Sequence, residues 1–280
     1  MKKIIINADD LGLSPTVNKK IEDCIKRGVI TSSTLIANAP AFDDGVRIAK
    51  QYPYVSVGAH LNLIEFAPLT NIPVFKKYGI VNEEGEFIEG AIYCAKFDEI
   101  LKKAIFEEWD AQISRIKEAG VIPSHCDSHQ HTHTIDALQE VLSKVMKKHG
   151  ICKVRRKIVP SVLLMIRGRK RPSVKFDKSK AIMPPKRNVI YRRFHLFTVI
   201  KECRSWNKRM RQLFITTNSF YAFNSFYYDL NYLHFGGRDS VIELMCHPGL
   251  AEFEEETNNL LKYPKWLPKG YELISYNELS

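Results

Sequence analysis

Short apolar runs alternate with amphipathic stretches along most of the 280-residue chain. The runs, which predict buried strands, lie at residues 3–8, 29–38, 55–63, 122–128, 153–159, 241–246 and 271–275. The stretches with apolar residues three and four positions apart, which predict helices, lie at residues 15–27, 42–51, 97–119, 135–149, 200–213 and 251–263. Strands that alternate with helices in this way predict a parallel sheet covered by helices.

Acidic and imidazole side chains collect where the predicted strands end. Asp9 and Asp10 follow the first run, His60 lies near the end of the third, a histidine-rich segment (residues 125–133) follows the fourth, and His247 follows the sixth. In a (β/α) barrel the carboxyl ends of the strands meet at one rim, where site residues gather. We therefore expect an α/β fold of the barrel type, with one domain over residues 1–280. An open doubly wound sheet ranks second, because it would place ligands mainly at one switch point.

Residues 160–200 interrupt this alternation with Pro-rich and Lys/Arg-rich sequence, and we expect a basic insertion around residues 160–235. Residues 151–215 hold 20 Lys/Arg and only two acids, whereas the whole chain has a net charge of +11. Such a block suggests an anionic partner, which could be a polyphosphate, a nucleic acid, an acidic glycan or a membrane surface. A solvated insertion without a binding role is an equally good interpretation.

The overall composition is ordinary for a globular protein, with 45% hydrophobic and 26% charged residues. The apolar start of the chain is too short for a signal-peptide core, and no run approaches the roughly 18 apolar residues of a membrane span. Six cysteines are scattered without a CxxC pair, which indicates reduced thiols. We therefore expect a cytoplasmic protein.

The histidine-rich segment holds four of the nine histidines. Neutral imidazole is the commonest side-chain metal ligand, and one carboxylate with two imidazoles forms a frequent catalytic site for a divalent ion. Hydrolysis also needs a base and an acid. Asp9 and Asp10 can divide the roles of base and ligand, and His247 is placed to be the acid. Each group taken alone has a commoner structural explanation, such as a turn, a helix cap or a core histidine.

Four segments carry a resemblance to a known family. They are residues 6–14 (INADDLGLS), 57–63 (VGAHLNL), 123–133 (PSHCDSHQHTH) and 243–249 (ELMCHPG). In order and rough spacing they resemble the signature blocks of the YdjC-like carbohydrate deacetylases, a group that includes chitooligosaccharide deacetylases. The ending at residues 270–276 (GYELISY) is also similar. The resemblance covers the chain except for roughly residues 155–235.

The resemblance implies a distorted (β/α) barrel, a divalent metal and the removal of acetyl groups from N-acetylated sugars. Asp10, His60 and His129 match the metal ligands of the family. Asp9 matches the catalytic base and His247 the acid. The remaining histidines become supporting or substrate-facing groups, with His131 and His133 as the substrate-binding pair and His125 as a support.

Several further expectations follow from the same resemblance. It implies a homodimer and a bound Mg ion, although an Asp-His-His set suits Zn or another transition ion better on grounds of ligand softness. The family usually has a Gly near the position of Phe66, so the shape of the loop after His60 is expected to differ here. A basic block is atypical of enzymes that act on neutral chitooligosaccharides, and we therefore expect an anionic or lipid-linked glycan precursor as substrate.

Two other functions compete with a deacetylase. The first is a nucleic-acid or membrane-surface binding protein on a degenerate barrel, with the basic block as its surface. Aromatic residues could then serve as stacking platforms, although core packing or a subunit interface explains them better: Tyr221, Phe223, Phe226, Tyr227 and Tyr228. A pure binding protein has no need of all the predicted ligands, which disfavours nucleic acid as the partner. The second is a metal-dependent phosphoesterase or glycosidase, although two adjacent acids do not easily flank a glycosidic bond.

Overall fold

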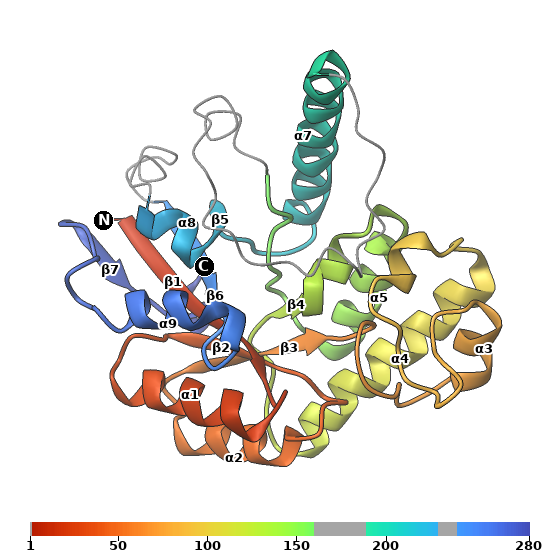
Figure 1. Cartoon of the computed structure of the whole chain (residues 1–280), viewed down its shortest axis with the longest axis horizontal. Coiled ribbons are helices and arrows are strands. Elements are labelled where there is room, and N and C mark those ends of the chain that lie inside the picture. Colours follow the sequence, from red (N-terminus) through yellow and green to blue (C-terminus); the bar gives the residue numbers. More distant parts are fainter. Residues whose placement is uncertain (1, 160–188, 229–239) are drawn as a thin grey trace.

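The structure, a computed structural model, describes residues 2–159, 189–228 and 240–280, and within residues 189–196 it describes the backbone only. Its centre is a seven-stranded parallel sheet with the order β4-β3-β2-β1-β6-β5, and β7 also pairs with β1 (Figure 1). The strands are β1 (Lys2–Leu11), β2 (Ser32–Leu35), β3 (Ser56–Leu61), β4 (Cys126–Ser128), β5 (Ser219–Ala222), β6 (Val241–Cys246) and β7 (Tyr271–Leu273). The parallel sheet and its covering helices confirm the α/β prediction.

The sheet curls into a half-barrel, and single bridges link its two edge strands. Cys126 of β4 pairs with Val154, and Lys153 pairs with Ile215, which leads into β5. Every strand pairing within the sheet and both of these bridges are parallel. The carboxyl ends of the strands therefore face one rim, as the barrel interpretation requires.

Helices cover the outer side of the sheet (Figure 1). The longer ones are α1 (Pro15–Lys26), α2 (Phe42–Gln51), α4 (Glu99–Glu118), α5 (Gln139–His149) and α7 (Val189–Arg211), and the shorter ones are α3 (Ile72–Lys77), α8 (Phe223–Tyr228) and α9 (Glu254–Leu260). Ser14 caps α1 by accepting a hydrogen bond from the Val17 backbone N–H, and Asp98 caps α4 in the same way through Leu101. α7 projects away from the rest of the molecule (Figure 1).

β1 lies at the centre of the sheet because its apolar residues can be buried on both faces. Ile4, Ile5 and Ile6 have no exposed surface. The strand pairs with β2, β6 and β7 and carries Asp9 and Asp10 at its carboxyl end. The register between β1 and β2 shifts between Ala8 and Leu11, directly at these two acids.

Three predictions about secondary structure need correction. The predicted strand at residues 153–159 is reduced to the two bridges at Lys153 and Val154. The strand β5 is missing from the prediction, because it has only four residues. The helix predicted at residues 200–213 begins earlier, at Val189, and ends at Arg211 as α7, while residues 160–188 lie outside the described part of the chain.

The division of the chain into domains stays a prediction. Among the described residues, no helix is long and apolar enough to cross a membrane.

Candidate active site

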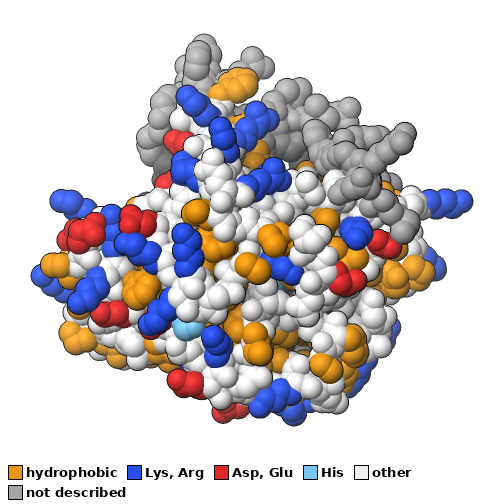
Figure 2. Space-filling model, turned by 180° about the vertical axis from the view of Figure 1, so that it is seen from behind, with side chains coloured by type: hydrophobic (Ala, Val, Ile, Leu, Met, Phe, Trp, Pro, Cys, Tyr) orange, Lys and Arg blue, Asp and Glu red, His pale blue; other side chains and the backbone are white. Residues whose placement is uncertain are grey.

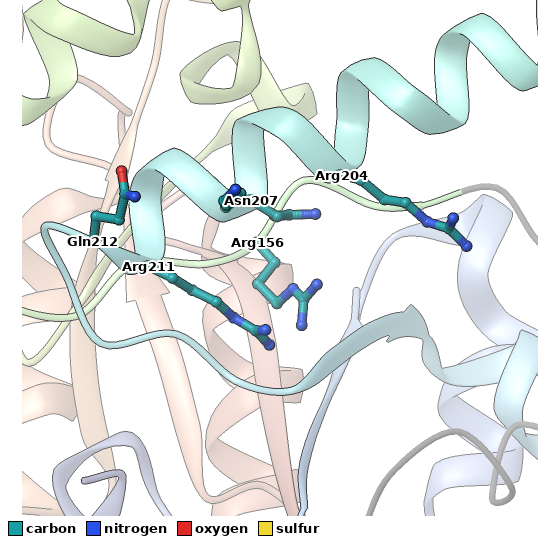
Figure 3. A pocket seen from close by; sticks show the side chains of 6 residues that line it. Arg156, Arg204, Asn207, Arg211 and Gln212 are labelled. Atoms are coloured by element: carbon teal, nitrogen blue, oxygen red, sulfur yellow. The ribbon is translucent and has the colours of Figure 1, made fainter.

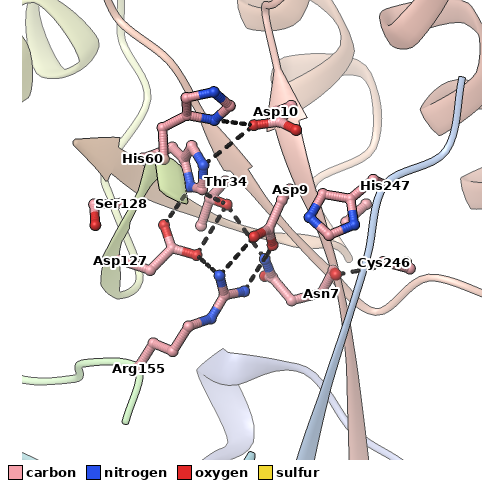
Figure 4. A network of polar contacts seen from close by, with 12 residues as sticks. Asn7, Asp9, Asp10, Thr34, His60, Asp127, Ser128, Arg155, Cys246 and His247 are labelled. Carbon is pink, nitrogen blue, oxygen red and sulfur yellow. Dashed lines mark hydrogen bonds and ion pairs between the residues drawn. The ribbon is translucent and has the colours of Figure 1, made fainter. Parts of the chain in front are cut away.

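Four of the predicted site residues, Asp9, Asp10, His60 and His247, lie together at the rim of the sheet (Figure 4). Asp9 and Asp10 come from the end of β1, and His60 comes from the end of β3. His129 begins a short 3-10 helix directly after β4, and His247 follows β6. The structure therefore brings together side chains from four strands that are far apart in the sequence.

Asp10, His60 and His129 form a cluster that could hold a metal ion, because their ligand atoms lie within 4.8 Å of one another. Asp10 Oδ1 lies 3.2 Å from His60 Nε2 and 2.8 Å from His129 Nδ1. Burial alone would lower the pKa values of His60 and His129, but the nearby carboxylates raise them to about 10 and about 9, respectively. Without a bound ion, then, the two imidazoles carry positive charge next to Asp10.

Asp127 fixes the orientation of His60. Its Oδ1 lies 2.6 Å from His60 Nδ1, and Thr34 Oγ1 lies 3.0 Å from the same nitrogen and donates to Asp127 Oδ2. A carboxylate on one ring nitrogen leaves the other nitrogen directed at the metal position, which is the usual support of a histidine ligand. One carboxylate, two imidazoles and this outer carboxylate fit a divalent cation with positions open for water and substrate.

A second group of three, Asp9, His60 and Asp127, has a similar spacing. Arg155 occupies the space between its carboxylates: Nη1 lies 2.7 Å from Asp9 Oδ2 and 2.6 Å from Asp127 Oδ2. A metal ion at this place would sit beside a buried guanidinium charge and be repelled by it. The chemistry of the donor set therefore favours the cluster that contains Asp10.

Arg155 is the buried centre of the carboxylate network. Its side chain has no exposed surface and binds Asp9 with both Nη atoms, each at 2.7 Å, while Nε lies 2.6 Å from Glu243 Oε1 (Figure 4 shows the guanidinium between Asp9 and Asp127). Burial would raise the pKa of Asp9, but the charge and hydrogen bonds of Arg155 outweigh burial and hold that pKa well below its usual range. Asp9 is therefore an ionised, rigidly oriented carboxylate.

Glu243 and Tyr276 support Arg155 from below the rim. The Tyr276 hydroxyl donates to Glu243 Oε2 at 2.5 Å, and Glu243 accepts from Arg155 with its other oxygen. Burial raises the pKa of Glu243 to about 7 although Arg155 and Tyr276 oppose the shift. Because three carboxylates hold the guanidinium and Tyr276 holds Glu243, the network keeps Arg155, and with it Asp9, in one position.

Glu256 on α9 supports His247. Its Oε1 accepts the backbone N–H of His247 at 2.7 Å and lies 3.3 Å from the ring Nδ1, while the ring stacks on Phe253 with centroids 4.3 Å apart. Burial would lower the pKa of His247, but the hydrogen bond and charge of Glu256, together with the charges of Asp9 and Asp10, raise it. Since Nδ1 faces Glu256, the proton on Nε2 is the one available to the site (Figure 4).

The other histidines of the cluster have different surroundings. His125 is buried, stacks on Tyr276 with ring centroids 3.5 Å apart, and lies so close to Gly58 that a Cβ at residue 58 would be 2.6 Å from the ring. His133 is also fully buried and lies between the Ser128 hydroxyl and the Arg155 carbonyl. These contacts hold the ring of His133 in place, and its side chain has no exposed surface. A direct role of His133 in substrate binding stays a prediction.

His131 differs from both because it is half-buried rather than fully buried. Burial lowers its pKa to about 3, so its ring is neutral, and its Nδ1, like Nε2 of His125, has no hydrogen-bond partner among the described residues. Its ring packs edge-on against Phe220 with centroids 5.7 Å apart. An unsatisfied buried nitrogen beside the site is consistent with its predicted role in substrate binding.

Several residues at the rim adopt backbone angles that only glycine adopts easily. The φ angles are 69° at Asp10, 49° at Gln130 and 63° at His131. Phe66, at the place where a family Gly is expected, has a φ of 64°. The chain therefore keeps a left-handed turn at residue 66 with a bulky side chain, at a cost of about 1–2 kcal/mol. Such strained positions tend to cluster at functional sites.

Sequence reasoning missed four residues of this site, namely Asp127, Arg155, Glu243 and Glu256. Asp127 and Glu243 lie inside two of the quoted segments, which was a usable signal, although Glu243 lies in the middle of β6 and not at its end. Arg155 lies within the basic block, for which the sequence leaves an anionic partner and a solvated insertion equally open. Glu256 lies on a helix that carries three successive acids, of which only Glu256 is buried.

The chain is similar to several known proteins. The sequence profile of the family described as YdjC-like protein matches residues 3–270. A carbohydrate deacetylase of Halalkalibacterium halodurans is 36% identical over 151 residues, which cover 53% of this chain and 62% of the relative. A carbohydrate deacetylase of Geobacillus stearothermophilus is 36% identical over 150 residues, which cover 52% of this chain and 57% of the relative. The match thus spans about three fifths of these curated relatives.

A crystal structure from Enterococcus faecalis V583, whose name assigns the protein provisionally to cellobiose-phosphate cleavage, has the same fold. Its TM-score is 0.71 at 23% identity, with 100% of this chain and 99% of the other chain covered. Because the family profile extends over nearly the whole sequence and the four segments form one site, this chain belongs to the YdjC-like protein family.

Proposed function

We propose that the protein is a metal-dependent carbohydrate deacetylase, a hydrolase that removes acetyl groups from N-acetylated sugars. The observation that carries the proposal is the arrangement of Asp9, held by Arg155, and His247, held by Glu256, beside the Asp10, His60 and His129 cluster. These are the base, the acid and the ligands that hydrolysis of an amide bond needs. The curated relatives that match part of the chain are named carbohydrate deacetylases, which supports the same reaction.

Asp10, His60 and His129 would hold the divalent cation. A cation held there supplies Lewis-acid chemistry, which makes a water molecule more acidic and polarises a carbonyl oxygen. Mg follows from the family resemblance, whereas two imidazole ligands favour Zn or another transition ion. Asp127 keeps the Nε2 atom of His60 directed at the cluster.

Asp9 and His247 move the two protons of the reaction. Asp9 takes a proton from the water whose oxygen attacks the acetamide carbon. The C–N bond then breaks, and His247 Nε2 gives its proton to the departing amine, so that acetate and a free amino sugar result. Arg155 keeps Asp9 ionised and oriented, and Glu256 raises the pKa of His247, which favours its protonated form.

Acetate release from a panel of N-acetylated mono- and oligosaccharides, with and without a chelator, tests this function. We expect release from at least one sugar, loss of release in the chelator and its recovery when a divalent metal is added back. Absence of release from the whole panel in the presence of Mg, Mn, Co and Zn would contradict the proposal.

His129→Ala is expected to weaken the binding of a divalent cation more than roughly 100-fold. Loss of a residue that only supports a metal ligand usually lowers the affinity about 10–100-fold, and loss of a ligand itself should cost more. The substitution removes one of three ligands, whereas Asp10 and His60 stay held by other contacts. Isothermal titration with Mg and with Zn measures the effect. His149→Gln, at a histidine bound to Asp110 away from the cluster, is the control, and equal affinities of both variants would remove His129 from the ligand set.

Glu256→Gln is expected to shift the alkaline limb of the pH–activity profile to lower pH. His247 must be protonated to act as the acid, so activity falls as the pH rises through its pKa. Loss of the Glu256 charge removes the main contact that raises this pKa, while burial continues to lower it. The variant keeps an acceptor oxygen for the His247 backbone N–H. Glu254→Gln on the exposed side of the same helix is the control, and an unchanged alkaline limb in Glu256→Gln would exclude His247 as the acid.

We further propose that the substrate is anionic, such as a phosphorylated sugar or a lipid-linked glycan precursor. The support is the excess of 20 Lys/Arg over two acids in residues 151–215. Deacetylation rates of neutral and phosphorylated N-acetylglucosamine at low and high salt compare the two substrate classes. Equal rates at both salt concentrations would argue for a neutral sugar. Assembly as a homodimer and a cytoplasmic location stay predictions.

A further inference from the structure

A cavity lies outside the rim, between α7 and the segment that leads into β5 (Figure 3). Its volume is about 400 Å³. It is lined by four cationic side chains and two amides: Arg156, Arg204, Lys208, Arg211, Asn207 and Gln212. None of these residues takes part in the proposed hydrolysis.

Arg156 and Arg211 are held side by side at the base of this basic pocket. Both donate to the carbonyl oxygens of Thr217 and Asn218. The distance to the Thr217 oxygen is 3.1 Å from Arg156 Nη1 and 3.2 Å from Arg211 Nη2. Arg211 Nε also donates to Thr216 Oγ1. The guanidinium groups are thus fixed by neutral acceptors, and their charges repel one another.

Arg204 and Lys208 extend the pocket along one face of α7. Together with Asn207 and Arg211 they follow the spacing i, i+3, i+4, i+7, which places them on the same side of a helix. Asn207 accepts from the backbone N–H of Lys157 and donates to its carbonyl oxygen, which anchors α7 beside Arg156. Figure 2 shows Lys and Arg side chains gathered where this helix projects.

The cations of the basic pocket have no acidic partner among the residues that the structure describes. Within the described part of the chain, no carboxylate forms an ion pair with Arg156, Arg204, Lys208 or Arg211. Arg209 on the same helix is a contrast, because it reaches Asp136 at 3.1 Å and Gln139 at 2.5 Å. Burial, followed by the charge of Arg211, lowers the pKa of Arg156 to about 10, so this side chain is still charged at neutral pH.

We propose that the basic pocket binds the phosphate group of an anionic ligand. Arginine forks match the oxygens of a phosphate, and a bound dianion would relieve the repulsion between Arg156 and Arg211. Arg204 and Lys208 are exposed and have long side chains, so they can close on the ligand from the side of α7. The phosphate can belong to a soluble ester or to a lipid headgroup, and both offer the same oxygens.

The basic pocket is separate from the hydrolytic site but adjoins it in the chain. Arg155 points to Asp9, whereas Arg156, the next residue, points to Thr217 and Asn218. A phosphate in the pocket would therefore contact Arg156, the neighbour in the chain of the arginine that holds Asp9. Where the phosphate belongs to the substrate, the inference rests on the proposed deacetylase function; the binding itself does not.

Calorimetric titration of the full-length protein with inorganic phosphate and with pyrophosphate at low salt tests the site. Sedimentation with phosphatidylglycerol vesicles, with phosphatidylcholine vesicles as reference, tests the lipid source in parallel. The main variant is Arg204→Gln with Lys208→Gln, because both side chains are exposed and their loss leaves the fold intact. A second variant is Arg211→Gln. The control is Arg209→Gln, which removes one charge from the same helix outside the pocket.

We expect the wild type to bind pyrophosphate or phosphatidylglycerol vesicles, and whichever probe binds identifies the source. Affinity should fall about tenfold or more for each lost contact in the pocket variants and stay unchanged in Arg209→Gln. Absence of binding to every probe would overturn the proposal, as would an equal loss in Arg209→Gln. Acetate release, measured separately, shows whether the hydrolytic site is intact in the same samples.

Discussion

Asp9→Asn is expected to lower the turnover of sugar deacetylation by about 10²–10⁴-fold, the usual contribution of a general base. The asparagine amide has nearly the same shape but cannot accept the proton of the attacking water. Arg155 loses one carboxylate partner, yet it keeps Asp127 at 2.6 Å and Glu243 at 2.6 Å, so the fold should survive. The cluster of Asp10, His60 and His129 does not include Asp9, and cation affinity should therefore be retained.

The measurement is the rate of acetate release at saturating sugar, together with cation affinity by calorimetry. Asp43→Asn, at an exposed acid on α2, is the matched control and should leave both quantities unchanged. Near-full turnover of Asp9→Asn would show that another group accepts the proton. Loss of cation binding in this variant would show instead that Asp9 is itself a ligand.

Arg155→Ala is expected to destabilise the protein by at least about 3–5 kcal/mol, the usual effect of removing one partner from a buried ion pair. Asp9, Asp127 and Glu243 would then be buried near one another without the guanidinium that binds all three. The ring of Phe220, 4.9 Å from the guanidinium, would also lose its packing partner. Urea unfolding followed by circular dichroism measures the loss.

Arg155→Lys separates the positioning role of Arg155 from its role in stability. Lysine keeps the positive charge but cannot bind both oxygens of Asp9 as a fork. We expect it to recover part of the stability, with kcat reduced and KM nearly unchanged, because the base is misoriented while the sugar still binds. Arg47→Ala, at an exposed ion pair with Glu22, should lower the free energy of unfolding by less than about 1 kcal/mol. A Lys variant with wild-type kcat would refute the positioning role.

Local sequence pattern was sufficient for the parts of the structure that depend on neighbouring residues. The apolar run at the start of the chain predicted β1, because Ile4, Ile5 and Ile6 can only be buried together in the middle of a sheet. Strand ends rich in acids and histidines predicted one rim, and the structure places Asp10, His60 and His129 together there. The period of 3.6 residues predicted α2 with its observed bounds. It also predicted the whole of α4, with one or two extra residues at each end.

The roles of Arg155 and Arg156 could not be predicted in this way. The two residues stand side by side in a block of cations, and no local feature distinguishes them. Arg155 is buried because the bridge between Val154 and Cys126 and the packing of β6 surround it with Asp9, Asp127 and Glu243. Arg156 faces the opposite way, to the carbonyl oxygens of Thr217 and Asn218. Burial and charge pairing are properties of long-range contacts, so residues far apart in sequence decided which arginine serves the site.

The histidine-rich segment shows the same division. Its composition indicated a metal site, and its position after β4 indicated the rim. Which histidine is a ligand depends on how the segment bends: the left-handed residues Gln130 and His131 break the alternation, so that His129 reaches Asp10 while His133 turns inward to Ser128. A sequence pattern therefore determined which chemistry gathers at the rim, and the packing of distant strands determined the place of each side chain, because a backbone turn and its partners arise from contacts across the whole fold.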